Sequence, residues 1–246
     1  MCPRTDQHAY TRERCSLPMT QAPPDRATNQ TGLDPQQIDP WWQLIQNALA
    51  QQRWLEAEGA LRRLLNDKPD NCDLLDLLGY ALLMQGAFAT CEATLRAALA
   101  YGSRNFWTPH KLGDALRGQQ RMAEAIAAYE QALEWGSDSP LTTRNLLQVL
   151  DGIDAAQAVA HLNRCAGASS ASALNWQQRP PWLQGACEAA LLSTGMELAH
   201  WLQSHGCPDP AVRRLALQDA VLHLDLATAL RLADGPLKQR LIGFLS

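Results

Sequence analysis

Apolar residues recur at helical spacing in two neighbouring runs between residues 112 and 139. In the first run, Leu112, Ala115 and Leu116 share one face because they are three and four positions apart. The second run has the same periodicity, in Ala125, Ile126, Tyr129, Ala132 and Leu133. Polar residues at 118–121 separate the two runs. The pattern predicts two short amphipathic helices joined by a tight turn.

The pattern returns along the chain at an interval of 34 residues. One step back, the matching residues are Leu78, Gly79, Leu82, Cys91, Leu95, Ala98 and Leu99. A second step back reaches Leu44, Ala48, Ala57, Leu61, Leu64 and Leu65. One such helix pair cannot bury its apolar faces alone, so the pairs must stack on their neighbours. The sequence therefore predicts an array of stacked antiparallel helix pairs.

The 34-residue period and its helix-turn-helix unit resemble the tetratricopeptide repeat (TPR) family. The resemblance covers residues 38–139 and is most specific in the third copy, where Gly113, Ala125 and Tyr129 match the family's pattern. In the second copy, Gly86 stands at the family's turn glycine. The resemblance implies an all-α fold, a right-handed α-solenoid (a TPR-like superhelix) with capping helices at its C-terminal end.

Four parts are predicted along the chain. Residues 1–37 contain several prolines and lack apolar periodicity, which is typical of a disordered tail. The TPR-like array is expected over 38–166, as repeats of about 38–71, 72–105 and 106–139 and a degenerate pair at 140–166. Residues 167–181 mix small, polar and proline residues, which predicts a linker. Helical periodicity returns at 182–246, where further repeats and a terminal cap are expected.

Composition and charge narrow the classes of function. The chain has 246 residues, of which 46% are hydrophobic, so it can bury a substantial core. Its formal net charge is −4 and its Lys and Arg residues are not clustered, which argues against a nucleic-acid-binding surface. The sequence has no run of 18 apolar residues and no signal-peptide core. We therefore expect no membrane insertion and a cytoplasmic location.

Candidate catalytic and metal-binding residues are few. The seven cysteines are widely spaced and never form a CxxC pair, which is typical of reduced, buried thiols. His161 and Cys165 can share a helix face, but two ligands are weak evidence for zinc. We found no phosphate-binding glycine loop and no GxSxG or HExxH motif. The sequence therefore predicts a non-catalytic protein without a metal or cofactor, although a Ser/His/Asp site assembled from distant residues stays open.

The TPR resemblance also implies a concave groove, lined by the first helix of each pair, that holds a peptide or helix of a partner protein. The family's groove positions correspond here to Trp42, Gln46, Leu49, Asp76, Tyr80, Leu83, His110, Asp114, Arg117, Arg144 and Gln148. Trp42 and Tyr80 are candidate anchors because they combine large apolar area with polar tips. Packing between adjacent repeats is the competing interpretation for both. Arg117 and Arg144 can pair with an acidic partner.

Two functional hypotheses follow. The favoured one is a protein–protein interaction scaffold that binds a partner segment in the groove, so substitutions near Tyr80 and Arg117 should matter most. The alternative is an accessory or regulatory subunit of a glycosyl- or sulfotransferase-type system, because TPR arrays resembling this one are often joined to such domains in bacterial proteins. Its C-terminal helices, from Trp182, would then dock the enzyme. Eight tryptophans leave homo-oligomer formation open.

Overall fold

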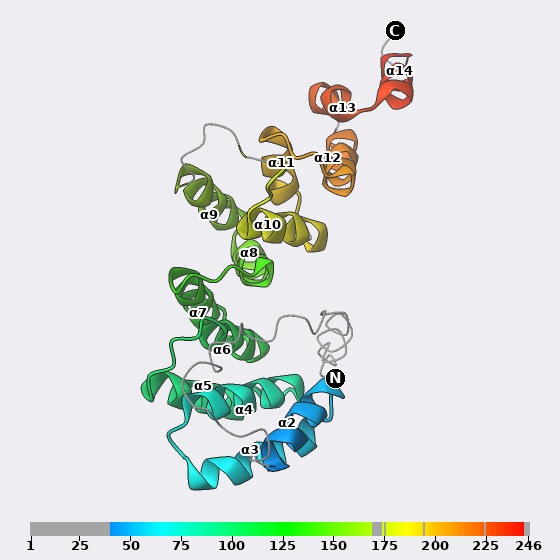
Figure 1. The fold of residues 1–246 in the computed structure, drawn as a ribbon. Helices are drawn as coiled ribbons and strands as arrows, with labels where there is room; N and C mark the ends of the chain where they lie inside the picture. The colour runs from blue at the N-terminus through cyan, green and yellow to red at the C-terminus, as the bar shows by residue number, and fades with distance from the viewer. Residues whose placement is uncertain (1–39, 169–173, 175, 194, 224, 244–246) are drawn as a thin grey trace, which may run out of the picture. The chain divides into compact units, whose positions relative to one another are not determined.

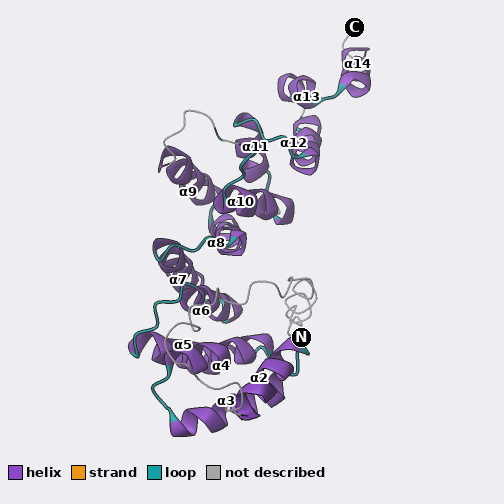
Figure 2. Cartoon of the chain, in the orientation of Figure 1, coloured by secondary structure: helices purple, strands orange, loops and turns teal. Residues whose placement is uncertain are grey.

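The structure is a computed structural model that describes residues 40–168, 174, 176–193, 195–223 and 225–243. The predicted disordered tail at 1–37 and much of the predicted linker lie outside these residues. Within them the chain forms helices α2 to α14 and no strand (Figures 1 and 2). The all-α prediction is confirmed. No helix in this described part is long and apolar enough to span a lipid bilayer.

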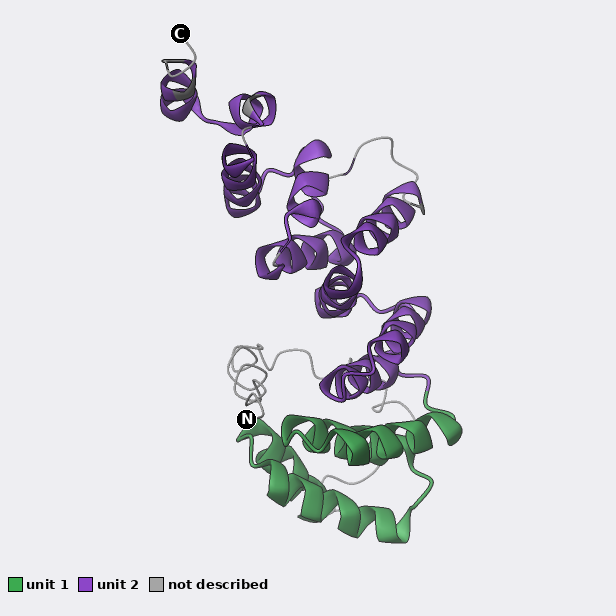
Figure 3. Cartoon of the chain, turned by 180° about the vertical axis from the view of Figure 1, so that it is seen from behind, with its two compact units in different colours: residues 1–103 green, residues 104–246 purple. Residues whose placement is uncertain are grey.

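The chain divides into two compact units, one up to Ser103 and one from Arg104 (Figure 3). The first unit contains α2 (Pro40–Ala50), α3 (Trp54–Asp67), α4 (Cys72–Met84) and α5 (Phe88–Ala100). Within this unit, α2 packs on α3, α3 packs on α4, and α4 packs on α5. Asn71 begins α4 as a cap, because its side chain accepts hydrogen bonds from the backbone N–H groups of Asp73 and Leu74 at 3.1 and 3.0 Å.

The second unit begins with the third predicted helix pair, α6 and α7, and continues through the less regular part of the chain. Its helices are α6 (Trp107–Gly118), α7 (Met122–Glu134), α8 (Pro140–Ile153), α9 (Ala155–Ala168), α10 (Pro181–Leu192), α11 (Glu197–Ser204), α12 (Pro210–Leu222), α13 (Leu226–Leu232) and α14 (Gly235–Gly243). α6 pairs with α7, and α7 packs on α8. α8 contacts α9 but packs more extensively on α10, which follows later in the chain. The α8–α10 contact is therefore the main departure from a sequence of simple hairpins.

The turns within the three clear repeats share one backbone conformation. Gly86 has a φ of 74°, in the left-handed region that glycine adopts without steric cost. Gln52 and Gln120 stand at the corresponding positions of the first and third repeats, and their φ values are 57° and 64°. Non-glycine residues rarely adopt this conformation, because Cβ crowds the backbone. The turn is thus kept in all three repeats even where the glycine is missing.

The cores of both units consist of small and branched apolar residues on the inner helix faces. Ile45, Leu61 and Leu95 are fully buried in the first unit. In the second unit, Leu116 and Tyr129 are at most 1% exposed. Leu61, Leu95, Leu116 and Tyr129 belong to the predicted 34-residue register, whereas Ile45 stands where the second and third copies have a glycine. The predicted repeat and domain boundaries, including the linker at 167–181 and the cap within 182–246, stay predictions.

Candidate protein-binding surface

The predicted groove residues of the first unit differ in exposure. Trp42 and Tyr80 are half-buried, Gln46 is exposed, and Leu83 is buried to 1% exposure. The ring of Tyr80 packs edge-to-face on Trp54, with 5.6 Å between the ring centroids. Because Trp54 belongs to the preceding repeat, Tyr80 makes the inter-repeat contact that the competing interpretation anticipated. A role of these residues in partner binding stays a prediction.

Two of the predicted groove residues of the second unit are buried. His110 is 2% exposed and Asp114 is fully buried, both on α6. Asp114 Oδ1 accepts hydrogen bonds from the Tyr129 hydroxyl at 2.7 Å and from Asn145 Nδ2 at 2.8 Å. These donors come from α7 and α8, so one carboxylate oxygen joins three helices.

His110 extends this buried polar network. Its Nε2 lies 3.5 Å from Asp114 Oδ2, and its Nδ1 lies 2.9 Å from Thr142 Oγ1 on α8. Arg117 adds a positive charge 3.7 Å from Asp114 Oδ1. A buried carboxylate is tolerated when donors and an opposite charge surround it. The network therefore fixes α6, α7 and α8 in their observed packing.

Arg117 and Arg144 lie nearer the surface, where they connect the first helices of successive pairs. Arg117 Nη1 donates to Gln148 Oε1 at 3.3 Å, which links α6 to α8. Arg144 Nη1 lies 3.5 Å from Glu188 Oε2, which links α8 to α10. The side chains of both arginines are about one fifth exposed. We refer to this line of polar contacts, with the cavity at its end, as the α6–α8–α10 surface.

A cavity of about 360 Å³ lies at the C-terminal ends of these helices. It is lined by Arg117, Met122, Gln148, Val149, Asp151, Gly152, Ile153, Leu192 and Ser193. Ser193 Oγ donates a hydrogen bond to Asp151 Oδ2. The other oxygen, Asp151 Oδ1, is buried and accepts no hydrogen bond from the described residues. Ile153 and Leu192 are 52% and 45% exposed at the rim.

The structure thus brings together Arg117 and Gln148 from the predicted groove, and it adds Asp151, Leu192 and Ser193, which were not predicted. α10 lies outside the 34-residue register, so no sequence position could be transferred to it. The only signal available was the apolar character of Leu192 at the end of a predicted helix. Its exposure, which makes it a candidate contact, depends on the tertiary packing.

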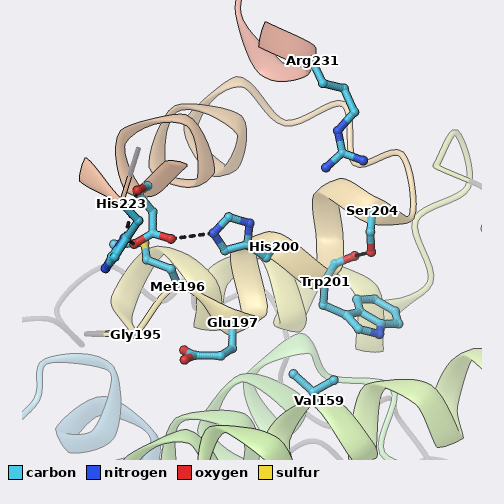
Figure 4. Close-up of a pocket in the computed structure, with 10 residues that line it drawn as sticks. Val159, Gly195, Met196, Glu197, His200, Trp201, Ser204, His223 and Arg231 are labelled. Atoms are coloured by element: carbon cyan, nitrogen blue, oxygen red, sulfur yellow. Dashed lines mark hydrogen bonds and ion pairs between the residues drawn. The ribbon is translucent and has the colours of Figure 1, made fainter. Parts of the chain in front are cut away.

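A second, larger cavity lies in the C-terminal half of the second unit (Figure 4). Its volume is about 820 Å³, and its lining comes from α9, α11, α12, α13 and adjoining turns. His200 Nε2 lies 2.7 Å from Asp219 Oδ2, and His223 Nδ1 lies 3.0 Å from Asp219 Oδ1. Figure 4 shows Arg231 extending from α13 on the side of Ser204, across the view from His223. Two histidines therefore share one carboxylate at the cavity wall.

Ser204 at the cavity wall lies next to His205, with 3.0 Å between Ser204 Oγ and His205 Nδ1. Ser204 Oγ donates to the backbone carbonyl of Trp201 at 2.7 Å instead of to the His200–Asp219 pair. His205 stacks on Trp201, with 4.0 Å between ring centroids, and so contacts a different group from His200. Among the residues that the structure describes, no group of three or more His, Cys, Asp or Glu side chains could hold a metal ion.

Comparison with known proteins identifies the fold. The chain is similar to a solved structure described as the crystal structure of MamA protein, with a TM-score of 0.52 and 15% identity over 73% of this chain and 90% of that one. A weaker similarity is to the structure of Naa15/Naa10 bound to HypK-THB, with a TM-score of 0.46 and 18% identity over 78% of this chain and 30% of that one. Another is to PilF of Pseudomonas aeruginosa, with a TM-score of 0.49 and 20% identity over 78% of this chain and 86% of that one. No family model and no curated protein sequence matches. The helix packing and the likeness to MamA show a TPR-like helical repeat fold.

Proposed function

We propose that this chain is a non-catalytic protein-interaction scaffold, and that a segment of a partner protein binds to its α6–α8–α10 surface. The observation that carries the proposal is the cavity of about 360 Å³, where exposed apolar side chains lie next to a cationic group and a carboxylate. The first unit would contribute a surface of its own through Trp42, Gln46 and Tyr80. A cytoplasmic location remains part of the proposal.

The lining indicates what the partner segment carries. Met122, Ile153 and Leu192 offer an apolar contact, and a cavity of this volume suits one large side chain. Asp151 also lines the cavity, so its carboxylate favours a hydrogen-bond donor on the partner. An apolar residue next to a donor, such as a Lys or Arg side chain or a backbone N–H, meets both conditions. The expected ligand is thus a peptide with an apolar anchor beside such a donor.

The experiment compares the native chain with the double variant Ile153→Glu, Leu192→Glu. Both residues are about half exposed, so the variant should stay folded while its charges oppose an apolar anchor. Proteins recovered by affinity purification from the source cell are identified by mass spectrometry, and the purified partner is then titrated calorimetrically. We expect binding to weaken at least about tenfold, as loss of an anchor contact does.

Leu222→Glu is the matched control, because Leu222 is 79% exposed on α12 and does not line the cavity. It should bind like the native chain. Arg117→Gln tests the cation separately. Gln is chosen because Arg117→Glu would add a carboxylate close to the buried Asp114 and weaken the fold. Equal binding by the native chain and the double variant would rule out this surface.

A transferase-accessory role is the second candidate, and it requires a surface on the C-terminal helices. The feature in its favour is the cavity of about 820 Å³ in that region, with Arg231 and the His200–Asp219–His223 group at its wall. In this case an enzyme would be recovered by the native chain and by the Ile153, Leu192 double variant, and lost with Arg231→Glu. The opposite pattern supports the scaffold proposal.

A further inference from the structure

Cys187 and Cys207 meet in the interior of the second unit although they are 20 residues apart. Cys187 lies on α10, and Cys207 lies in the connection between α11 and α12. Their Sγ atoms are 3.9 Å apart, and each residue is 5% exposed. α10, α11 and α12 pack on one another, as Figure 1 also shows. The spacing of the cysteines in the sequence contains no sign of this pairing.

The backbone around both thiols is held in place. Cys187 is inside α10, where helical hydrogen bonds fix its position. Cys207 follows a turn at Gly206, whose φ is 80°, and its N–H donates to the Leu202 carbonyl at 3.0 Å. Gln203 Nε2 donates to the Cys207 carbonyl at 3.1 Å. A disulfide needs about 2.05 Å between sulfurs, so rotation of two short side chains has to close the remaining gap.

The two thiols differ in acidity. A hydrogen bond from Cys187 lowers the pKa of Cys207 to about 7, and the backbone N–H of Asp209 acts in the same direction, against the effect of burial. The same hydrogen bond and burial raise the pKa of Cys187. Of the two thiols, Cys207 is therefore the one that ionises more readily. Since a thiolate is the nucleophile in cysteine oxidation, Cys207 is the residue that reacts first.

We propose that Cys187 and Cys207 form a redox-modification site that hydrogen peroxide converts into an intramolecular disulfide. The Cys207 thiolate attacks one peroxide oxygen and the O–O bond breaks, which gives a sulfenic acid and hydroxide. The Cys187 sulfur then attacks the sulfenic sulfur, so that the S–S bond forms, the S–O bond breaks, and the thiol proton leaves with the hydroxyl group as water. The cysteines lose two electrons, and the peroxide is reduced to two waters once a proton from solvent neutralises the hydroxide.

A small neutral oxidant is the class of reactant that fits this site. Both cysteines are almost completely buried, so a folded protein disulfide could reach them only after local unfolding. The resulting bond would tie α10 to the α11–α12 connection and close a loop of 20 residues. Cross-links of this kind stabilise the folded state by restricting the unfolded chain.

The experiment treats the reduced full chain with limiting hydrogen peroxide, followed by alkylation in denaturant and peptide mapping. Trypsin leaves both cysteines in one peptide, whereas cleavage after Glu188 and Glu197 separates them. We expect a linked Cys187–Cys207 peptide that has lost two hydrogens and that a reductant separates. The melting temperature of the oxidised chain should rise by about 4 °C or more and return on reduction. Cys91, whose thiol donates to the Gly79 carbonyl, is the internal reference and should stay reduced.

Single variants determine the order of the steps. In Cys187→Ser, Cys207 should accumulate as a sulfenic acid that dimedone traps, and no linked peptide should form. In Cys207→Ser, Cys187 should remain unmodified at the same peroxide dose. Cys165→Ser is the matched control and should oxidise like the native chain. If the native chain forms no linked peptide, the proposal is wrong. If dimedone traps a sulfenic acid on Cys187 of the native chain, the proposed order of the steps is wrong as well.

Discussion

Two close helix contacts of the second unit are built differently. In the hairpin of α6 and α7, Gly113 faces the ring of Tyr129, and a Cβ atom at Gly113 would lie 2.7 Å from Tyr129 Cε1. Between α8 and α10, Gly185 faces backbone, and a Cβ atom there would lie 2.3 Å from the Pro140 carbonyl oxygen and 3.0 Å from the Arg144 nitrogen. A side chain occupies the space next to Gly113, whereas helix backbone occupies the space next to Gly185.

This difference separates two ways of building a helical array. The Gly113 contact repeats that of Gly79 with Leu95 in the first unit, at the same register positions. It joins neighbours in sequence, and the residue that fills the notch can shift by changing its rotamer. The Gly185 contact joins helices that are not consecutive. A side chain added at Gly185 could be accommodated only if a whole helix moved, because it would meet backbone atoms. Substitutions should therefore have unequal effects at the two glycines.

The largest effect is expected for Gly185→Ala. Its methyl group would overlap the backbone of α8, so α8 and α10 must separate, which should lower the free energy of unfolding by about 3 kcal/mol, the upper part of the usual overpacking range. Urea denaturation followed by circular dichroism measures this loss. Gly152→Ala is the control, because nothing lies within 4 Å of a Cβ atom there. Similar stabilities of the two variants would show that the α8–α10 contact is looser than described.

Gly113→Ala should cost less, about 1–2 kcal/mol, because the Tyr129 ring can tilt. The tilt is limited by the hydrogen bond from the Tyr129 hydroxyl to Asp114 at 2.7 Å. Gly113→Leu should cost more, because it adds volume where the ring already lies. A double-mutant cycle with Tyr129→Ala measures the coupling by denaturation. A coupling energy near zero would contradict the repeat register at Gly113.

The stability at acid pH should test the packing of α9, whose contact with α8 is smaller than that of α10. Burial, together with the nearby Arg164 charge, lowers the pKa of His161 from its usual 6.5 to about 4. The neutral imidazole is thus favoured by folding, so its stabilisation is complete above pH 6.5 and is lost as the pH falls toward 4. We expect a loss of up to about 3 kcal/mol over this range, because each unit of pKa shift corresponds to about 1.4 kcal/mol. The measurement is the pH dependence of unfolding of the native chain minus that of His161→Gln, and a zero difference would place His161 in contact with water.

The smallest effect is expected where a glycine has no close neighbour. Gly59 lies inside α3, and a Cβ atom there would meet nothing within 4 Å. Gly59→Ala should therefore raise the free energy of unfolding by about 0.5–1 kcal/mol, because alanine restricts the unfolded chain and favours the helix. Thermal and urea denaturation of the variant measure the gain. A loss of stability would mean that this position is more crowded than the structure indicates.

Part of the candidate site was predictable from the sequence. The family register selected Arg117, Arg144 and Gln148, which do lie on the α6–α8–α10 surface. The same register selected His110 and Asp114, which are buried in a polar network. The register of a repeat predicts the direction in which a side chain leaves its helix. It does not predict whether a neighbouring helix covers that side chain. Exposure therefore could not be inferred from these positions.

The sequence by itself determined the all-α class, the helix pairs at 40–134 and their turns, because these depend on residues at most 34 positions apart that recur periodically. Only the tertiary structure decided the α8–α10 packing, the exposure of Leu192 near Asp151, and the approach of Cys187 to Cys207. Each of these depends on backbone paths between helices outside the repeat, and no local pattern of apolar and polar residues encodes such a path. Periodicity determines which face a helix buries, and packing determines what that face meets.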